Sequence, residues 1–213
     1  MKLSARAAPL LVCTVCTWLV GCAQYTGTGR GLTPNVWQRE RGWIAVEHVP
    51  PLRQRSEHDC GPTALAMVLA YWKQQPAASL ALALGLDADK RYSAGELRDR
   101  ARAVGFSAFV IAGTFEDIVH ELKQKRPVIV GMAKPTLQGA VAHYEVVVGL
   151  HAATQRIATL DPSLGWRQNS LAGFLREWVP TGQLLLIVLG PSAHPVTRPA
   201  AIDKVVAHSS ERH

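Results

Sequence analysis

The sequence predicts an α+β fold with a mostly antiparallel sheet. Helical patterns dominate the first part of the chain, strand patterns dominate the second part, and the strands there are joined by short connections. An apolar run typical of a buried helix begins four residues after a cysteine. With 213 residues, of which 48% are hydrophobic and 18% charged, the chain is long enough for one well-cored domain with appendages.

The apolar run covers residues 64–71 and has no polar face, which is typical of a central, buried helix. Cys60 stands where the polar loop before it changes into this helix, and Pro62 suits a first helical turn. A thiol at a helix N-terminus is favoured as the reactive thiolate. The alternative interpretation of Cys60 is a small, inert core residue.

The remaining elements are expected from capping and hydrophobic patterns. Ser93 with Glu96, and Thr114 with Asp117, have the spacing of capping boxes at helix starts. Helices are expected at 78–86, 93–104, 115–123 and 170–178. Strands are expected at 43–46, 106–111, 144–150, 156–160 and 184–189, and residues 128–130 are expected to begin another.

Residues 1–21 are typical of a secretory signal peptide. Lys2 and Arg6 form a positive start, and the apolar run 7–20 is short for a membrane span. The ending Leu19–Cys22 resembles a bacterial lipobox, which implies cleavage before Cys22 and attachment of lipid to that residue. Ala23 follows in place of an aspartate, so the resemblance implies an outer-membrane lipoprotein facing the periplasm. The alternative is an ordinary signal peptide with an incidental cysteine.

The rest of the chain divides into three parts by composition. Residues 22–43 are expected to be the lipidated cysteine and a flexible tether, because large apolar residues are few there. Residues 44–190 are expected to form the domain. Residues 191–213, rich in Pro, Ala, Ser and His, are expected to be a disordered tail.

The cysteine count makes Cys60 a candidate nucleophile. Cys13 and Cys16 would leave with the signal peptide and Cys22 would be acylated, so Cys60 would be the one thiol left after export. That excludes a disulfide framework. A free thiol in an oxidising compartment is open to oxidation unless it is useful or well hidden.

Charge and motifs argue against other classes of protein. The formal net charge of +7 is spread along the chain without basic blocks, so no nucleic-acid binding is expected. His58 lies near Cys60, but no second cysteine and no spaced His or Glu pair accompanies it, so no metal site is expected. We expect no cofactor.

A cysteine nucleophile needs a base and a group that orients the base. His143 directly precedes the expected strand 144–150, so we expect it at the start of a central, buried strand. Asp161 follows the next strand, one hairpin away. Taken alone, Asp161 before Pro162 is typical of a plain Asx turn. Together, His143 and Asp161 could face Cys60 from the ends of neighbouring strands.

These residues resemble the C39 peptidases and their C39-like relatives over about residues 44–189. The matching motifs are Gln54, Asp59, Cys60-Gly61, His143-Tyr144 and Asp161-Pro162. The resemblance implies a papain-like fold, in which an N-terminal helical half carries the nucleophile helix and packs on the sheet. It implies Cys60 as nucleophile, His143 as general base and acid, and Asp161 as the residue that orients the histidine. It also implies Gln54 as an oxyanion-hole donor.

The sequence thus leads us to expect a lipid-anchored cysteine peptidase that acts on a peptide or protein, including a secreted or exported one, through a thioester. Two alternatives remain: an acyltransferase or amidase on the same fold, and a module that binds a leader peptide of an export system without cutting it. Glu145 departs from the apolar residue expected there, and we expect it either to shift the pKa of the base or to bind a substrate amine.

Overall fold

The computed structural model of the chain describes residues 25–37, 39–73, 84–87 and 89–191. The expected signal peptide, Cys22, most of the expected helix at 78–86 and the expected tail beyond Pro191 lie outside these residues. The lipid anchor therefore stays a prediction.

The described residues contain an eight-stranded sheet in which every pairing is antiparallel. The strands are β1 (Arg30–Gly31), β2 (Trp43–Ala45), β3 (Phe106–Ala112), β4 (Val128–Thr136), β5 (Gly139–His151), β6 (Arg156–Asp161), β7 (Gly165–Ser170) and β8 (Leu184–Pro191). Their order is β1-β7-β6-β5-β4-β8-β3, and β2 pairs with the end of β5. The predicted fold class, α+β with a mostly antiparallel sheet, is confirmed.

Five α-helices accompany the sheet in the described part of the chain: α1 (Pro34–Trp37), α2 (Cys60–Lys73), α4 (Ala94–Ala103), α5 (Phe115–Lys123) and α6 (Leu171–Trp178). Both expected capping boxes form, with Ser93 and Glu96 before α4 and Thr114 and Asp117 before α5. Each box satisfies backbone N–H groups that the helix itself leaves unpaired, which fixes where the helix begins. Short 3-10 turns follow at Ala152–Thr154 and Val179–Thr181.

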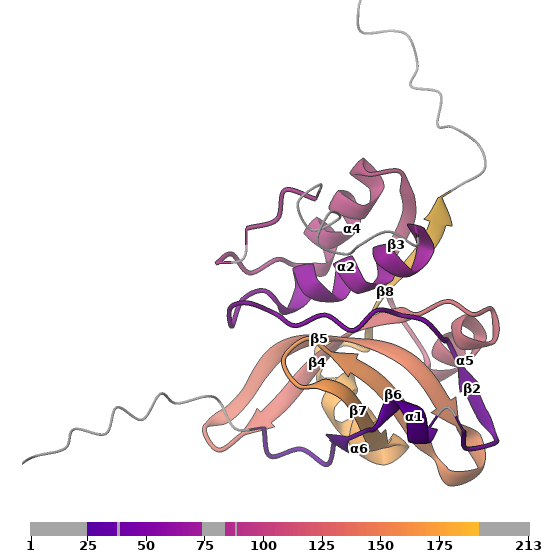
Figure 1. Ribbon diagram of the computed structural model, residues 1–213. Helices are drawn as coiled ribbons and strands as arrows, with labels where there is room; N and C mark the ends of the chain where they lie inside the picture. Colours follow the sequence, from indigo (N-terminus) through magenta and orange to yellow (C-terminus); the bar gives the residue numbers. More distant parts are fainter. Residues whose placement is uncertain (1–24, 38, 74–83, 88, 192–213) are drawn as a thin grey trace, which may run out of the picture.

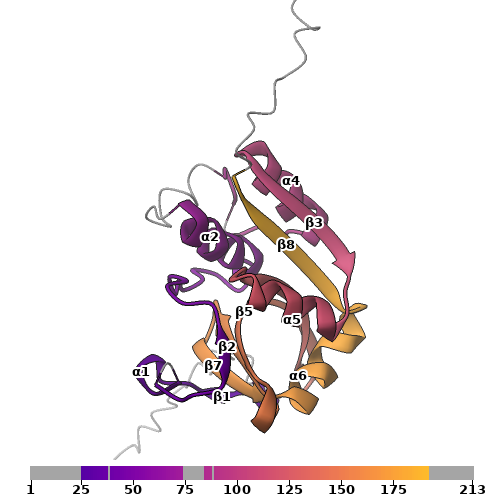
Figure 2. The same cartoon turned by 90° about the vertical axis from the view of Figure 1, so that its right-hand side faces the viewer.

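The helices cover both faces of the strongly twisted sheet. In Figures 1 and 2, α2 and α4 lie on one side of the central strands, and α5 and α6 lie on the other. The N-terminal end of α2 lies near β4 and β5, so it brings Cys60 close to the middle of the sheet.

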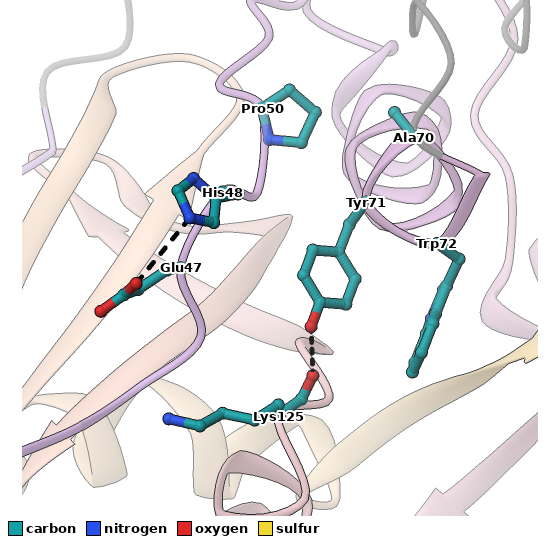
Figure 3. A pocket seen from close by; sticks show the side chains of 7 residues that line it. All are labelled: Glu47, His48, Pro50, Ala70, Tyr71, Trp72 and Lys125. Atoms are coloured by element: carbon teal, nitrogen blue, oxygen red, sulfur yellow. Dashed lines mark hydrogen bonds and ion pairs between the residues drawn. The ribbon is translucent and has the colours of Figure 1, made fainter.

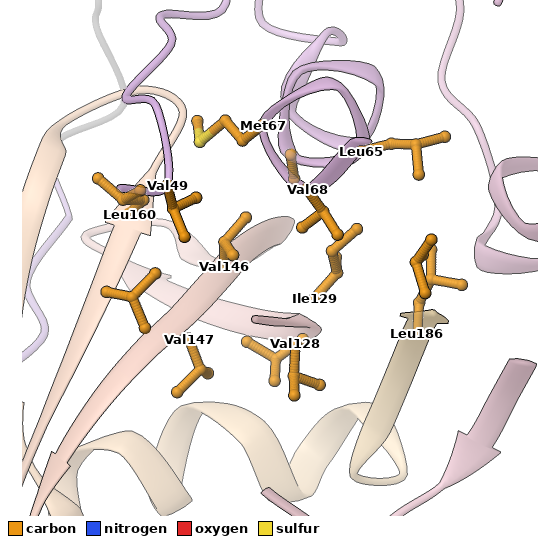
Figure 4. Close-up of a cluster of buried hydrophobic side chains, with 14 of the residues drawn as sticks. Val49, Leu65, Met67, Val68, Val128, Ile129, Val146, Val147, Leu160 and Leu186 are labelled. Atoms are coloured by element: carbon orange, nitrogen blue, oxygen red, sulfur yellow. The ribbon is translucent and has the colours of Figure 1, made fainter. Parts of the chain in front are cut away.

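The hydrophobic core lies on both sides of β4 and β5. Leu65, Met67 and Val68 of α2 are fully buried and belong to one cluster with Val146 of β5 and Leu186 of β8. Figure 4 shows Val68 and Val146 between the helix and the strands, with Leu65 and Met67 on either side of the helix. Burying such a side chain contributes about 1.5–3 kcal/mol, so this contact holds the helix and its N-terminal cysteine in place.

The prediction of a flexible tether at 22–43 is wrong for the described residues of that segment, 25–37 and 39–43. Trp37 is 1% exposed, and its ring centroid lies 5.4 Å from those of both Trp43 and Trp166. Strand β1 pairs with β7, and Tyr25 forms a β-bridge with Thr136. The segment has few large apolar residues, but its aromatic side chains find partners in the domain, and that burial overrides the local composition.

Strand β5 begins well before its expected limit, and strands β1 and β7 were not expected. His143 lies inside β5, not at its start, because β4 and β5 continue as a paired hairpin as far as Thr136 and Gly139. Strand β7 has the polar sequence Gly-Trp-Arg-Gln-Asn-Ser and exists through its pairing with β6. Such strands depend on a neighbour that local sequence does not show.

Across the described ranges, no helix has both the length and the apolar character needed to span a membrane.

Candidate active site

Cys60 is the first residue of α2, and its side chain is largely buried. The helix begins close to β5 because residue 61 is a glycine. A Cβ on Gly61 would lie 2.9 Å from Leu97 Cδ1 and 3.1 Å from Tyr144 Cδ2. Burial alone would raise the pKa of the Cys60 thiol. A hydrogen bond to His143, the charge of that ring and backbone N–H groups outweigh this and lower the pKa below its ordinary value.

His143 faces Cys60 from β5 and Asp161 from the end of β6. Its Nε2 lies 2.8 Å from Asp161 Oδ1, and both side chains are buried. Because Asp161 engages Nε2, Nδ1 is the ring nitrogen left for the hydrogen bond with the thiol. The structure therefore brings together the three residues that the sequence suggested as nucleophile, base and orienting group.

Asp161 combines the two interpretations that the sequence left open. Its Oδ1 accepts the backbone N–H groups of Ser163 (2.7 Å) and Leu164 (3.2 Å), as in an Asx turn, and also contacts His143. Burial would raise the pKa of this carboxyl, but the hydrogen bond and charge of His143 lower it.

The His143 ring is strongly favoured in its charged form. Burial lowers the pKa of the ring, but the hydrogen bonds to Asp161 and Cys60 and the nearby carboxylates raise it to about 10. A thiol with a lowered pKa beside an imidazole with a raised pKa favours a thiolate–imidazolium pair.

A cavity of about 180 Å³ opens beside Cys60 and His143. It is lined by His58, Cys60, Gly61, Arg91, Tyr92, Gly131, Met132, Ala142, His143, Tyr144, Thr181 and Leu184. Sequence reasoning set His58 aside and missed Arg91 and Tyr92, which precede α4 in a loop without a recognisable motif. Closeness to Cys60 in the chain was the one signal that pointed to His58.

Gln54 does not line this cavity. Its amide Nε2 donates to the carbonyl of Ser56 (2.8 Å), and its Oε1 is buried with no hydrogen-bond partner among the described residues. Its backbone N–H donates to Pro162, the residue after Asp161. The loop before Cys60 is therefore tied to the turn that carries Asp161, while the second amide hydrogen of Gln54 is unused by Ser56.

Glu145 is 2% exposed and does not line the cavity. Its Oε1 lies 2.5 Å from Lys134 Nζ, and the same nitrogen lies 2.8 Å from Glu177 Oε2. The carboxylate is thus engaged inside the protein, which argues against the expected contact with a substrate amine. The sequence also led us to expect that Glu145 shifts the pKa of the base, and its charge does raise the pKa of His143. Burial, Asp161 and Cys60 each affect that pKa more than Glu145 does.

No metal is assigned to the cluster around His143. Among the described residues, the donor atoms of His143, Glu145 and Asp161 lie within 4.8 Å of one another. His143 and Asp161 are hydrogen-bonded to each other, and Glu145 pairs with the ammonium of Lys134. These donors are already engaged within the protein.

A second cavity, of about 800 Å³, lies beside the C-terminal end of α2 (Figure 3). Tyr71 and Trp72 line it with Glu47, His48 and Lys125, and the Tyr71 hydroxyl donates to the Lys125 carbonyl at 2.6 Å. Ten residues of helix, about 15 Å, separate Ala70 at its edge from Cys60. None of the candidate catalytic residues lines it, so its larger volume does not mark it as the reaction site.

A cysteine at the start of a buried helix, facing a histidine and an aspartate on an antiparallel sheet, is the arrangement of a papain-like cysteine peptidase domain. Residues 46–186 match the model of the Peptidase_C39 like family. The chain belongs to this family.

The chain is also similar to parts of larger transport proteins. It is 30% identical over 148 residues to the mesentericin-Y105 transport/processing ATP-binding protein MesD of Leuconostoc mesenteroides. The match covers 68% of this chain but 19% of MesD, so the chain corresponds to about a fifth of that relative.

Two solved structures share the fold. The peptidase domain of Streptococcus ComA, a bi-functional ABC transporter involved in quorum sensing, matches with a TM-score of 0.54 at 22% identity, covering 67% of this chain and 99% of that domain. A protein described as a C39-like peptidase from Bacillus anthracis matches with a TM-score of 0.52 at 18% identity, covering 69% and 97%. The protein thus contains a C39-like peptidase domain that shares its fold with the peptidase domain of an ABC transporter.

Proposed function

We propose that the protein is a cysteine peptidase that cleaves a peptide or protein through a Cys60–His143–Asp161 triad and a thioester intermediate. The observation that carries this proposal is the Cys60 thiol hydrogen-bonded to His143, whose far nitrogen is held by Asp161, at the wall of an open cavity. An inert core cysteine requires neither the base nor the cavity.

The chemistry follows from these positions. The Cys60 thiolate attacks the carbonyl carbon of the scissile amide, and the C–N bond breaks as the His143 imidazolium gives its proton to the leaving amine. Neutral His143 then takes a proton from water, the hydroxide forms the new C–O bond, and the thioester C–S bond breaks. Asp161 holds the ring in the orientation that both proton transfers need.

Two donors are proposed for the oxyanion. The N–H of Cys60 belongs to the first turn of α2, where no intrahelical acceptor exists. The second donor is the amide hydrogen of Gln54 that Ser56 does not use. Preorganised donors of this kind typically contribute about 3 kcal/mol each to transition-state stabilisation.

We also propose that the protein is held at the periplasmic face of the outer membrane by lipid on Cys22. The sequence of residues 1–22 supports this. Metabolic labelling with an alkyne fatty acid tests it: the wild-type chain should be labelled and found in the outer-membrane fraction, and Cys22→Ser should lose both properties. Cys60→Ser, which also removes one cysteine, is the matched control and should keep both.

The substrate proposed is a peptide or a secreted protein, since the relative MesD is described as a transport/processing protein. A peptide library incubated with the wild-type chain and with Cys60→Ala tests this proposal. Cleavage by the wild type alone, with an acyl adduct on Cys60 detected by mass spectrometry, supports the peptidase. A non-peptide acyl group on Cys60 would indicate the acyltransferase or amidase instead. Peptides that bind both forms equally and stay uncut would indicate a binding module.

A further inference from the structure

Behind the triad lies a buried charged cluster that the proposed chemistry does not use directly. Lys134 of β4 lies between Glu145 of β5 and Glu177 of α6, with its Nζ 2.5 Å and 2.8 Å from their carboxylate oxygens. All three side chains are less than one tenth exposed. Burying three charges is costly, and apolar residues of similar size are often at least as stable. Stability alone therefore does not account for the cluster.

The N-terminal segment closes this cluster from outside. The ring of Tyr25 lies 5.7 Å from the ring of His143 and 5.8 Å from Lys134 Nζ, centroids being used for the rings. A Cβ on Gly27 would lie 2.3 Å from Glu177 Oε1, so the backbone there passes directly over the carboxylate. Exclusion of water strengthens the interactions among these charges.

Glu145 is the member of the cluster that lies close to the base. Oxygen and nitrogen atoms of His143, Glu145 and Asp161 lie within 4.8 Å of one another, so the imidazole has two carboxylates near it. The titratable and charged groups that face His143 from the packed elements are Asp161 of β6, Glu145 of β5, Cys60 of α2 and Tyr25 before β1. Lys134 of β4 faces Glu145 on its other side.

Glu145 acts on His143 at short range, because its carboxylate lies within 4.8 Å of the imidazole donor atom. Lys134 binds that carboxylate on its other side, and Glu177 is the second carboxylate on the same ammonium. Because Glu177 binds the same ammonium, one lysine is shared by two carboxylates, and the three residues retain one net negative charge. Lys134 thus fixes the position of Glu145 without neutralising the whole cluster.

We propose that Glu145 is a positioning residue for the triad: its carboxylate, fixed by Lys134, keeps His143 in the imidazolium form opposite the Cys60 thiolate. This inference rests on the proposed function for the importance of that ion pair. It assigns a role to a side chain that touches neither the cavity nor the reacting atoms.

The experiment compares two glutamates that share one lysine. Glu145→Gln and Glu177→Gln each remove one carboxylate charge from Lys134, but Glu145 alone lies beside His143. In full-length protein with ¹³C-labelled histidine, the His143 signal is identified by its loss in His143→Asn, and its titration midpoint is measured by NMR. We expect Glu145→Gln to lower the midpoint by about one to two pH units. Glu177→Gln should move it by less than about half a unit, and Glu145→Asp should retain the wild-type value.

Each outcome decides the proposal. An unchanged midpoint in Glu145→Gln, or an equal shift in both glutamine variants, would overturn it and leave the cluster a structural element. If Glu145→Gln does not fold, Lys134→Met/Glu145→Gln/Glu177→Gln removes the cluster without leaving an unpaired charge, and the same downward shift is expected. The titration needs no substrate. A lack of peptidase activity would therefore contradict the proposed function without changing the result of this experiment.

Discussion

Asp161 holds the Nε2 of His143 at 2.8 Å with the same oxygen that closes its own Asx turn through Ser163 and Leu164. The turn is local and forms with the β6–β7 hairpin, so the carboxylate is oriented whether or not the histidine is present. Backbone N–H groups thus hold the Oδ1 acceptor in place, and His143 binds to an atom whose position is already fixed.

Replacing Asp161 with Asn should keep the turn but remove the charge that holds His143. We expect kcat/KM on a cleaved peptide to fall by about 10³-fold or more, because the ring loses its orientation and the imidazolium its partner. The exposed Asp89→Asn is the control and should stay near wild type. A loss of less than about tenfold in Asp161→Asn would contradict the triad.

Replacing Gln54 with Ala tests the oxyanion hole separately from the nucleophile. Removing one donor should lower kcat by about 10²-fold. The rate at which iodoacetamide alkylates Cys60, followed by peptide mapping, should change little, because alkylation forms no oxyanion. If both rates fall together, the Gln54 side chain acts by supporting the loop through its hydrogen bond to Ser56 instead.

Activity should extend far to the alkaline side. The thiolate–imidazolium pair exists above the lowered pKa of Cys60 and below the pKa of His143, which is raised to about 10. We therefore expect kcat/KM to stay level through pH 8–9 and to fall as pH rises through about 10. A basic limb near pH 6.5, the ordinary histidine value, would contradict this arrangement.

Stability should follow the same histidine. A raised folded pKa means that the charged ring stabilises the fold fully below about pH 6.5, and that this contribution is lost as pH rises through about 10. Between pH 6.5 and pH 10.5 the melting temperature of the wild type should therefore fall more than that of His143→Asn. Equal losses in the two proteins would show that the ring gains no stability from its charge.

Two glycines in first helical turns should respond oppositely to alanine. In Gly61→Ala the new Cβ meets Leu97 and Tyr144 at about 3 Å, so we expect a loss of about 1–3 kcal/mol in stability and a lower rate of Cys60 alkylation. Gly95 has no neighbour nearer than 3.9 Å, so Gly95→Ala should be neutral or stabilising by up to about 1 kcal/mol. Urea unfolding measures both.

Trp37 tests whether the N-terminal segment is part of the domain. Its side chain is buried against Trp43, Trp166 and the backbone of Gly149. Trp37→Ala should lower the free energy of unfolding by about 3–5 kcal/mol. Trp37→Phe should cost less, because it keeps an aromatic ring and removes a buried indole N–H that has no hydrogen-bond partner among the described residues. A loss below about 1 kcal/mol in Trp37→Ala would restore the tether interpretation.

Local sequence was sufficient where the stabilising contacts are local. Ser93 and Thr114 accept hydrogen bonds from the third residue of their own helices, so α4 and α5 could be placed to within one residue. The apolar α2 with Cys60 at its start, and the strands beside His143 and Asp161, were found from their apolar runs. Only a few residues decide each of them.

Tertiary structure decided what depends on pairing between distant segments. Strand β7 pairs with β1, and Trp37 packs against Trp166, across more than a hundred residues of sequence. The true length of β5 follows from its hairpin with β4, whose sequence has a mixed pattern. The sequence determined that Cys60 is the candidate nucleophile and that His143 and Asp161 are its candidate partners. Only the fold decided that Glu145 binds Lys134 and not a substrate, because the charge that satisfies a buried carboxylate comes from another strand.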